Sequence, residues 1–405
     1  MSRRFVITRT EIHGKRPLVC AVYEEHRMLE VNCIPENAPP QILNNIYVAR
    51  VSQVVKNIGA AFVEIAKGQR CFLPLDDLRE PVYVKRISAQ PLVQGDELLV
   101  QIVRESVKTK EPQVTTNLSL AGIYCVVTST GKHLGISSKL PSERRARLRE
   151  LATDVYDERF GLVVRTNACD EKDEVLLEEI QALTGEMSDM TSYAHGRRLY
   201  DLVYQAPPEY IRLLQNQPLA QLSEVVTDDV SVFAVLEVYA KRHPSTKLLD
   251  KLHLYEDAQY DLHKLYSVQV QLERALQKKV WLKSGANLVI EPTEALTVID
   301  VNSSKNVKKK KQEEQRLLVN LEAAKETARQ LRLRNLSGII VIDFIDMASQ
   351  EAKEQLLTAM REFVRQDPVK TEVVDLTRLG LMELTRKKMR RPLHEQLEVK
   401  PSGSG

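Results

Sequence analysis

Two aspartates, Asp300 and Asp343, each stand at the end of an apolar run. The runs read LTVID and GIIVID, and a long segment with helical periodicity lies between them. A helix that links two strands makes a crossover, so the strands are expected to be parallel and to end at the same edge of a sheet. If they are neighbours, they lie about 4.8 Å apart, at the edge where open α/β sheets bind ligands.

Two carboxylates at that spacing repel each other, and a proton, a basic side chain or a cation relieves the repulsion. Neither run contains a basic residue. This favours Mg²⁺, which takes one or two carboxylates and leaves positions for water and phosphate. Asn302 shares the Asp300 side of an extended strand and can orient a water or a carboxylate without adding charge. With the lysines Lys308 to Lys311 downstream, the pattern predicts metal-assisted phosphoryl chemistry on a nucleic acid.

A structural role is the alternative for both aspartates. Acids that close a strand or cap a helix are common, and on the pattern alone that role is the more frequent one. Asp346 is a weaker candidate for the site because alternation places it on the face opposite Asp343. Its position ahead of the segment SQEAKEQLL favours a turn or a helix cap.

The elements around the aspartates alternate between strand and helix over residues 280–395. The expected order is strands at VWLKS, ANLVIEP and LTVID, a helix from about Gln312 to Arg334, a strand at GIIVIDF, a helix, a strand at KTEVVDL and a helix at MELTRKKM. This order predicts an α/β unit with a partly parallel sheet. The long helix has one apolar stripe, formed by Leu317, Leu321, Ala324, Ala328 and Leu331.

Upstream, residues 42–118 contain several short β-type segments separated by turn residues. This spacing predicts a small barrel or sandwich, and an OB-type barrel fits it well. Such barrels bind single-stranded nucleic acid through aromatic stacking and basic side chains. Phe62 and Phe72 are the candidate stacking rings, and positions in the barrel core remain the alternative for both.

Composition bounds the class of protein. A chain of 405 residues predicts two to four domains, and 43% hydrophobic with 28% charged residues is typical of globular proteins. No run approaches the roughly 18 apolar residues of a membrane span, and the basic start lacks the apolar segment of a secretion signal. The five cysteines are scattered and never form a CxxC pair. They predict buried thiols in a reducing cytoplasm rather than a disulfide framework or a zinc site.

Basic residues cluster although the net charge is only +3. Clusters within a nearly neutral chain predict local contacts with anions. Solvated helix faces are the alternative for each cluster.

Several segments closely resemble the ribonuclease E/G family. The catalytic core of that family resembles EPTEALTVIDVNS, NLEAAKETARQLRLRNLSGIIVIDFIDM and DLTRLGLMELTRKKMRRPL. Its ribosomal-protein-type OB domain resembles NNIYVARVSQVVKNIGAAFVEIAKGQRCFLPLDD, and its sensor of RNA 5′ ends resembles LSLAGIYCVV and GLVVRT. The resemblance covers the chain up to about residue 395.

The resemblance implies an endoribonuclease of rRNA and mRNA processing and decay. It implies cleavage of single-stranded RNA, often at A/U-rich sites, with products that carry 5′-phosphate and 3′-hydroxyl ends. Asp300 and Asp343 would then hold Mg²⁺, and Asn302 would position one of them.

Two further sites are implied by the same resemblance. A pocket for a 5′-monophosphate would be formed by Arg165 and Thr166 and lined by Gly122 and Val126. The guanidinium fork suits phosphate because it can bind two oxygens at once. The grip on RNA near the scissile bond would come from Phe62, Phe72 and Lys110.

The implied fold is a composite of α+β and α/β parts. An RNase H-like subdomain, without that fold's own catalytic acids, would contain an inserted OB-fold β-barrel and a 5′-sensor, and a DNase I-like α/β catalytic subdomain would follow. The expected ranges are 1–37 and 211–277 for the two parts of the RNase H-like subdomain, 38–118 for the S1-like OB-fold domain, 119–210 for the 5′-sensor, 278–395 for the catalytic subdomain and 396–405 for a flexible tail.

The chain departs from the family pattern near its end. Many members carry a CPxC zinc link that pairs protomers, whereas this chain reads RRPLHEQLEVKPSGSG. Zinc is therefore not expected: either a homodimer or homotetramer is held by protein contacts alone, or the chain was cut short. Without a long scaffold tail, the chain resembles the G branch more than the E branch. A non-catalytic RNA-binding or ribosome-assembly factor on the same scaffold is the alternative, against which the intact acid pair and Asn302 argue.

Overall fold

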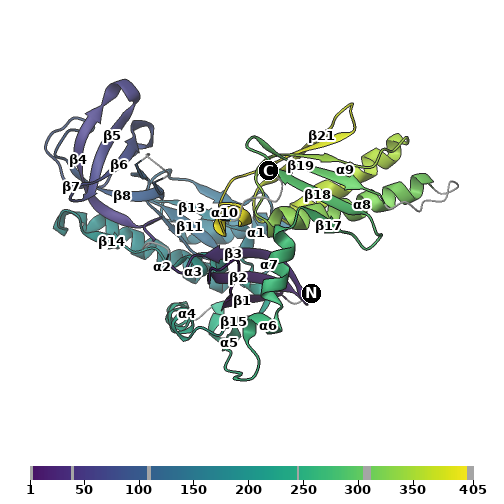
Figure 1. Cartoon of the computed structure of the whole chain (residues 1–405). Coiled ribbons are helices and arrows are strands. Elements are labelled where there is room, and N and C mark those ends of the chain that lie inside the picture. Colours follow the sequence, from purple (N-terminus) through teal and green to yellow (C-terminus); the bar gives the residue numbers. More distant parts are fainter. Residues whose placement is uncertain (1–2, 38–40, 107–110, 244–245, 304–311, 399–405) are drawn as a thin grey trace. The chain divides into compact units, whose positions relative to one another are not determined.

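A computed structural model describes residues 3–37, 41–106, 111–243, 246–303 and 312–398 (Figure 1). The chain divides into two compact units. The first unit is formed by Met1–Ala38, Leu222–Glu237 and Lys251–Gly405, and the second is formed by Pro39–Gln221 and Val238–Asp250.

A five-stranded sheet in the first unit joins segments that are far apart in sequence. Its order is β16-β15-β1-β2-β3. The strands are β1 (Arg3–Arg9), β2 (Leu18–Glu24), β3 (Arg27–Ile34), β15 (Leu222–Thr227) and β16 (Leu252–Leu254). The pairing of β1 with β15 is parallel and sets Val6 opposite Val226. The sheet begun by the first three strands is therefore completed by strands that follow more than 200 residues later. Two helices lie between β15 and β16 in the sequence, α4 (Val230–Arg242) and α5 (Leu248–Lys251). Two more follow β16, α6 (Leu262–Leu265) and α7 (Val268–Leu276).

A six-stranded sheet in the same unit carries the two aspartates. Its order is β17-β18-β19-β20-β22-β21. The strands are β17 (Lys279–Trp281), β18 (Asn287–Pro292), β19 (Leu296–Asn302), β20 (Gly338–Asp343), β21 (Thr371–Leu376) and β22 (Leu381–Arg386). Only β19 and β20 pair in parallel, with α8 (Gln312–Leu333) in the connection between them. Helix α9 (Gln350–Arg365) follows β20, and α10 (Leu393–Gln396) lies near the end of the described chain.

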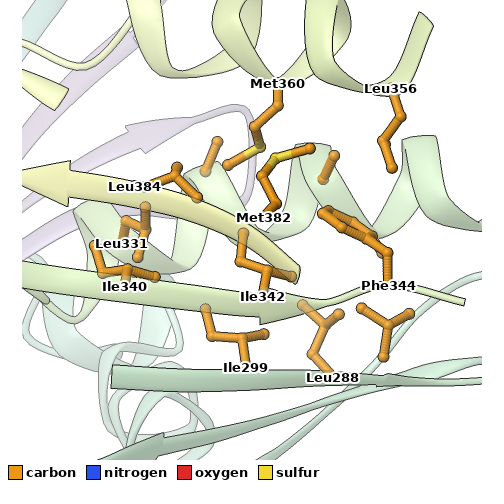
Figure 2. Packing of buried hydrophobic residues seen from close by; sticks show 14 of the residues in the cluster. Leu288, Ile299, Leu331, Ile340, Ile342, Phe344, Leu356, Met360, Met382 and Leu384 are labelled. Atoms are coloured by element: carbon orange, nitrogen blue, oxygen red, sulfur yellow. The ribbon is translucent and has the colours of Figure 1, made fainter. Parts of the chain in front are cut away.

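The hydrophobic core of this part lies between α8, α9 and one face of the sheet. Figure 2 shows Ile299, Ile340 and Ile342 of the strands facing Met360 of α9. Helix α9 buries Leu356, Met360 and Val364 at intervals of four residues, the spacing of one helical face. Because neighbouring residues of a strand point to opposite faces, the residues between these isoleucines lie on the other face of the sheet.

The predicted elements are confirmed here with one exception. The expected long helix is α8, and the expected strands around the aspartates are β19 and β20. The prediction of a helix at MELTRKKM is wrong, because this segment begins with strand β22. Met382 and Leu384 are buried and Glu383 is exposed, which is strand alternation, and pairing with both β20 and β21 satisfies the backbone.

The second unit contains a closed β-barrel. Pairing of β4 with β8 closes the circuit β4-β5-β6-β9-β8, which confirms the predicted OB-like barrel. These five strands are β4 (Ile46–Val55), β5 (Ala60–Ala66), β6 (Gln69–Pro74), β8 (Glu97–Arg104) and β9 (Gln113–Thr115); β7 (Tyr83–Lys85) and β14 (Leu202–Tyr204) extend the sheet.

A four-stranded sheet with order β10-β11-β13-β12 forms the rest of the second unit, together with helices. Its strands are β10 (Ser119–Ala121), β11 (Cys125–Thr128), β12 (Leu134–Ile136) and β13 (Gly161–Val164), and the helices are α1 (Ser142–Val155), α2 (Asp173–Ser192) and α3 (Glu209–Gln215). Helix α2 contacts β10 and β11. No helix in the described ranges has the length and apolar character needed to cross a membrane.

Candidate active site

Asp300 and Asp343 lie directly opposite each other on the parallel strands β19 and β20. Their preceding neighbours, Ile299 and Ile342, are buried in the core under the helices. Alternation therefore places both carboxylates on the opposite face of the sheet, at strand positions that are only partly buried or exposed. The crossover expectation is confirmed: the two acids share one edge and one face of the sheet.

The negative charges of the two aspartates repel each other, which disfavours ionisation of both at once. The pKa of Asp343 is raised, first by burial and then by the negative charges of Asp300 and Asp346. Asn302 donates a hydrogen bond from Nδ2 to Oδ2 of Asp300 at 2.7 Å. In the part of the chain that the structure describes, neither Asp300 nor Asp343 forms an ion pair. Two neighbouring carboxylates without a positive partner form a site that favours a bound cation.

Two parts of the sequence interpretation of Asp346 are wrong, its place by strand alternation and the helix cap, whereas the turn alternative stays a prediction. Strand β20 ends at Asp343, so alternation cannot be extended to residue 346, and the Asp346 charge is close enough to raise the pKa of Asp343. The cap of α9 is Ser349, whose side chain accepts the backbone N–H of Ala352. Within the described ranges, no group of three or more His, Cys, Asp or Glu side chains is arranged to hold a metal. The candidate site therefore rests on the acid pair.

Helix α8 holds the loop that follows β20. The fully buried side chain of Asn320 donates to the backbone oxygen of Ile345 at 2.8 Å and accepts from its N–H at 3.0 Å. One oxygen of Glu313 accepts the N–H groups of Ala348 and Ser349. Neither residue could be assigned this role from the sequence, although a polar residue next to the apolar stripe of α8 was a usable signal for Asn320.

The predicted 5′-phosphate residues lie around one end of β13. Arg165 donates from Nη1 to the backbone oxygens of Gly122 at 2.6 Å and Gln215 at 3.3 Å. Its other nitrogen, Nη2, hydrogen-bonds to the side chain of Asn216. Thr166 is exposed, with Oγ1 at 2.9 Å from Oγ of Ser137. The structure thus brings Arg165 to Gly122. Several N–H donors of the Arg165 guanidinium already hydrogen-bond to oxygens of the protein.

Val126 is half-buried on β11, opposite Ala121 of β10 and Val163 of β13. Since Ala121 immediately precedes Gly122, the structure also brings Val126 near the start of the predicted pocket. Burial lowers the pKa of Arg165, while the charge of Glu179 opposes that effect.

Glu179 of α2 was missed by the sequence analysis. Its buried carboxylate accepts the backbone N–H groups of Ile123, Tyr124 and Cys125 at 2.7 to 2.9 Å. Burial raises the pKa of Glu179, and these hydrogen bonds oppose the increase. A Cβ atom at Gly122 would lie 2.4 Å from that carboxylate. Glycine is therefore needed there by close packing, whether or not phosphate binds.

Phe62 and Phe72 lie opposite each other on the outer surface of the barrel. Their ring centroids are 5.9 Å apart, and the guanidinium of Arg70 lies 4.4 Å from the Phe62 centroid. Both rings are partly exposed, whereas the strand neighbours Ala61 and Val63 belong to the buried barrel core. The barrel-core alternative for the two phenylalanines is therefore wrong. Lys110 lies outside the described residues.

Comparison with known proteins decides the family. The model of the Ribonuclease E/G family matches residues 119–389. Ribonuclease G of Salmonella typhimurium is 32% identical over 395 residues, which cover 93% of this chain and 78% of that protein. The chain belongs to the Ribonuclease E/G family.

Other relatives in the family agree with this assignment. Ribonuclease G of Escherichia coli is 31% identical over 93% of this chain and 78% of its own length. Ribonuclease E of Nostoc sp. is 33% identical over 93% of this chain, but the match spans only 55% of that longer protein. The predicted family is thus confirmed, and so is the predicted class of enzyme, an endoribonuclease.

The acid pair of this Ribonuclease E/G family member fits a divalent cation. Mg²⁺ prefers oxygen ligands and is commonly held by one or two carboxylates, and the pKa of Asp343 is raised by burial and then by the charges of Asp300 and Asp346. Asp300 and Asp343 would hold the ion, and Asn302 keeps the Asp300 carboxylate in place through its hydrogen bond.

We expect Asn320→Ala to lower the free energy of unfolding by about 2 kcal/mol, because it leaves two buried backbone groups of Ile345 without partners. The loop beside Asp343 would also lose its anchor, so kcat for RNA cleavage should fall more than KM rises. Denaturant unfolding and steady-state kinetics test this prediction. Leu318→Ala, which removes an exposed side chain of the same helix, is the control, and equal effects of both changes would contradict the anchoring role.

Proposed function

We propose that the chain is a Mg²⁺-dependent endoribonuclease that cuts single-stranded RNA at the pair Asp300 and Asp343. The observation that carries the proposal is the register of β19 and β20, which sets the two carboxylates opposite each other. Their mutual repulsion, without a positive partner among the described residues, supports a divalent cation as the ligand of this pair.

In this proposal the chain's own residues prepare the site for the reaction. Asp300 and Asp343 supply the carboxylate oxygens, and Asn302 fixes the orientation of Asp300. When bound, Mg²⁺ polarises the scissile phosphate and offsets the negative charge that develops there. Water attacks phosphorus, the bond from phosphorus to the 3′ oxygen breaks, and a proton reaches the leaving oxygen. The products carry 5′-phosphate and 3′-hydroxyl ends.

The finer assignments belong to the same proposal. We assign the five-stranded sheet to the RNase H-like subdomain, supported by the pairing of β1 with β15, and the six-stranded sheet to the DNase I-like subdomain. The barrel is assigned to S1-like RNA binding, supported by the outward rings of Phe62 and Phe72. Processing and decay of rRNA and mRNA in the cytoplasm is the proposed role, and a homodimer or homotetramer without a zinc link is the proposed assembly.

Recognition of a 5′-monophosphate is proposed for Arg165 and Thr166. We expect Arg165→Ala to remove the preference for RNA with a 5′-monophosphate over RNA with a 5′-hydroxyl, because the guanidinium is the cationic group at this site. The measurement is the ratio of kcat/KM for two RNAs that differ only at the 5′ end. Using the ratio cancels a general loss of folded enzyme, and a ratio equal to that of the unmodified protein would rule out this pocket.

The main experiment uses the whole protein with 5′-monophosphorylated single-stranded RNA, in Mg²⁺ or in EDTA. The proposal predicts internal cleavage that requires Mg²⁺ and leaves 5′-phosphate ends. Binding of RNA without any Mg²⁺-dependent cleavage would instead support a non-catalytic RNA-binding or ribosome-assembly factor.

A further inference from the structure

One face of the six-stranded sheet carries Asp300, Asn302 and Asp343, and we call it the open face. This face extends to the edge strand β17. The strand pairs set Trp281 opposite Asn287, which in turn lies opposite Asn302. Directly opposed residues of antiparallel strands point to the same face. Trp281 therefore shares the open face with Asn302.

The other residues of β17 agree with this placement. Lys279 lies opposite Val289, which is itself opposite Asp300, so Lys279 is also on the open face. Val280, between Lys279 and Trp281, packs against the core on the helix side. The acid pair and both β17 side chains thus occupy one surface, with β17 two strand spacings from Asp300 and three from Asp343.

Trp281 is the only tryptophan of the chain, and 66% of it is exposed. Nζ of Lys279 lies 4.1 Å from the centroid of its ring. Tryptophan is usually buried to a large extent, so an exposed ring beside an acid pair invites a functional explanation. An aromatic face with an adjacent cation is also what single-stranded nucleic acids use, since bases stack on the ring and phosphates meet the charge.

We propose that Trp281 and Lys279 form a stacking platform for a base of the RNA strand whose scissile phosphate lies at Asp300 and Asp343. The inference rests on the proposed nuclease function, because it takes the occupant to be the substrate of the acid pair. Two strand spacings and two residues along the strand separate Trp281 from Asp300 by about 12 Å. The stacked base therefore lies near the scissile phosphate without touching it, and Trp281 acts as a positioning residue.

Three observations favour RNA over another occupant. The ring lies on the face of the acid pair, in the strand row of Asn302, and Lys279 lies in the strand row of Asp300. The Lys279 ammonium supplies a positive charge on a surface where the acid pair would otherwise repel phosphates. With Lys279 in place, most of Trp281 is still accessible, so the ring can also stack on a base.

Tryptophan fluorescence tests the platform directly, because Trp281 is the only emitter of its kind. The probe is a 5′-monophosphorylated A/U-rich RNA of about ten nucleotides, added to the whole protein in EDTA so that no cleavage occurs. We expect saturable quenching of the emission. A series of RNAs with one abasic position each should lose the quenching at one position near the cleavage site, which is mapped separately in Mg²⁺.

Substitutions give the second readout. Fluorescence anisotropy of labelled RNA should show roughly tenfold weaker binding for Trp281→Ala and a change within about twofold for Trp281→Phe, which keeps a stacking ring. Tyr260→Ala, which removes another exposed aromatic residue of the same unit, should bind like the unmodified protein. Lys279→Ala should weaken binding and reduce its dependence on salt.

The outcomes separate this inference from the proposed function. If RNA binds but the emission does not change, or if Trp281→Ala binds RNA normally, the platform is wrong even when Mg²⁺-dependent cleavage is observed. A change of oligomeric mass in Trp281→Ala, with RNA affinity unaltered, would assign the ring to a protein interface and also overturn it. Quenching with abasic sensitivity in a protein that never cleaves RNA would support the platform and refute the nuclease function.

Discussion

Asp343→Asn is expected to lower Mg²⁺-dependent cleavage by at least about 1,000-fold, which corresponds to about 4 kcal/mol of transition-state stabilisation. The amide keeps the size of the side chain but removes one of the two charges that face each other across β19 and β20. Affinity for RNA in EDTA should stay within about twofold, because the acid pair contributes repulsion rather than attraction to phosphates.

The same variant has an expected effect on stability. Burial and the charges of Asp300 and Asp346 raise the pKa of Asp343, so its ionised form is disfavoured in the folded protein. Removing the charge should leave the melting temperature in EDTA equal or higher, and the gain in melting temperature on adding Mg²⁺ should disappear. Cleavage assays and thermal unfolding with and without Mg²⁺ test both parts.

Glu362→Gln is the matched control for this prediction. Glu362 is an exposed acid of helix α9, which covers the opposite face of the sheet. Its substitution should leave cleavage and the response to Mg²⁺ unchanged. Full activity of Asp343→Asn, or an equal loss in both variants, would contradict the assignment of the acid pair.

Gly122→Ala is expected to lower the free energy of unfolding by about 3 kcal/mol or more. The added methyl group would lie 2.4 Å from the Glu179 carboxylate, and displacing that carboxylate leaves three buried N–H groups without their acceptor. Denaturant unfolding measures the loss. Any loss of 5′-end preference in this variant would then follow from a disturbed pocket wall.

Gly185→Ala provides the control for Gly122→Ala. Gly185 lies inside helix α2 with no atom within 4 Å of an added Cβ. Alanine at that position should raise the free energy of unfolding by about 0.5 to 1 kcal/mol, since it favours the helix. If Gly122→Ala proved as stable as the unmodified protein, Glu179 would not hold the backbone of residues 123–125 as described.

The acid pair could be predicted from the sequence because local patterns determine it. The apolar runs before Asp300 and Asp343, and the helical stripe between them, imply parallel strands without knowledge of any distant contact. Strand β22 could not be predicted in the same way. Its segment MELTRKKM carries helix-favouring residues, and the choice of strand depends on pairing with β20 and β21, which no local pattern encodes.

Residues whose role depends on distant contacts were also missed. Glu179 reads as one acid among several on an amphipathic helix, yet the three N–H groups that donate to it lie 54 to 56 residues earlier in the chain. Asn320 binds a loop 25 residues later. The five-stranded sheet joins β1 to β15 across more than 200 residues, and only the resemblance to a known family suggested a split subdomain.

The central claim is that Asp300 and Asp343 together hold one divalent cation at the place where RNA is cut. The most direct measurement is a crystal structure of the protein soaked in Mn²⁺, with anomalous scattering used to locate the ion. The account predicts one anomalous peak within coordination distance of both carboxylates, at about 2.0 to 2.3 Å, and its loss in Asp343→Asn. A peak bound elsewhere, with the two carboxylates free of metal, would contradict the account.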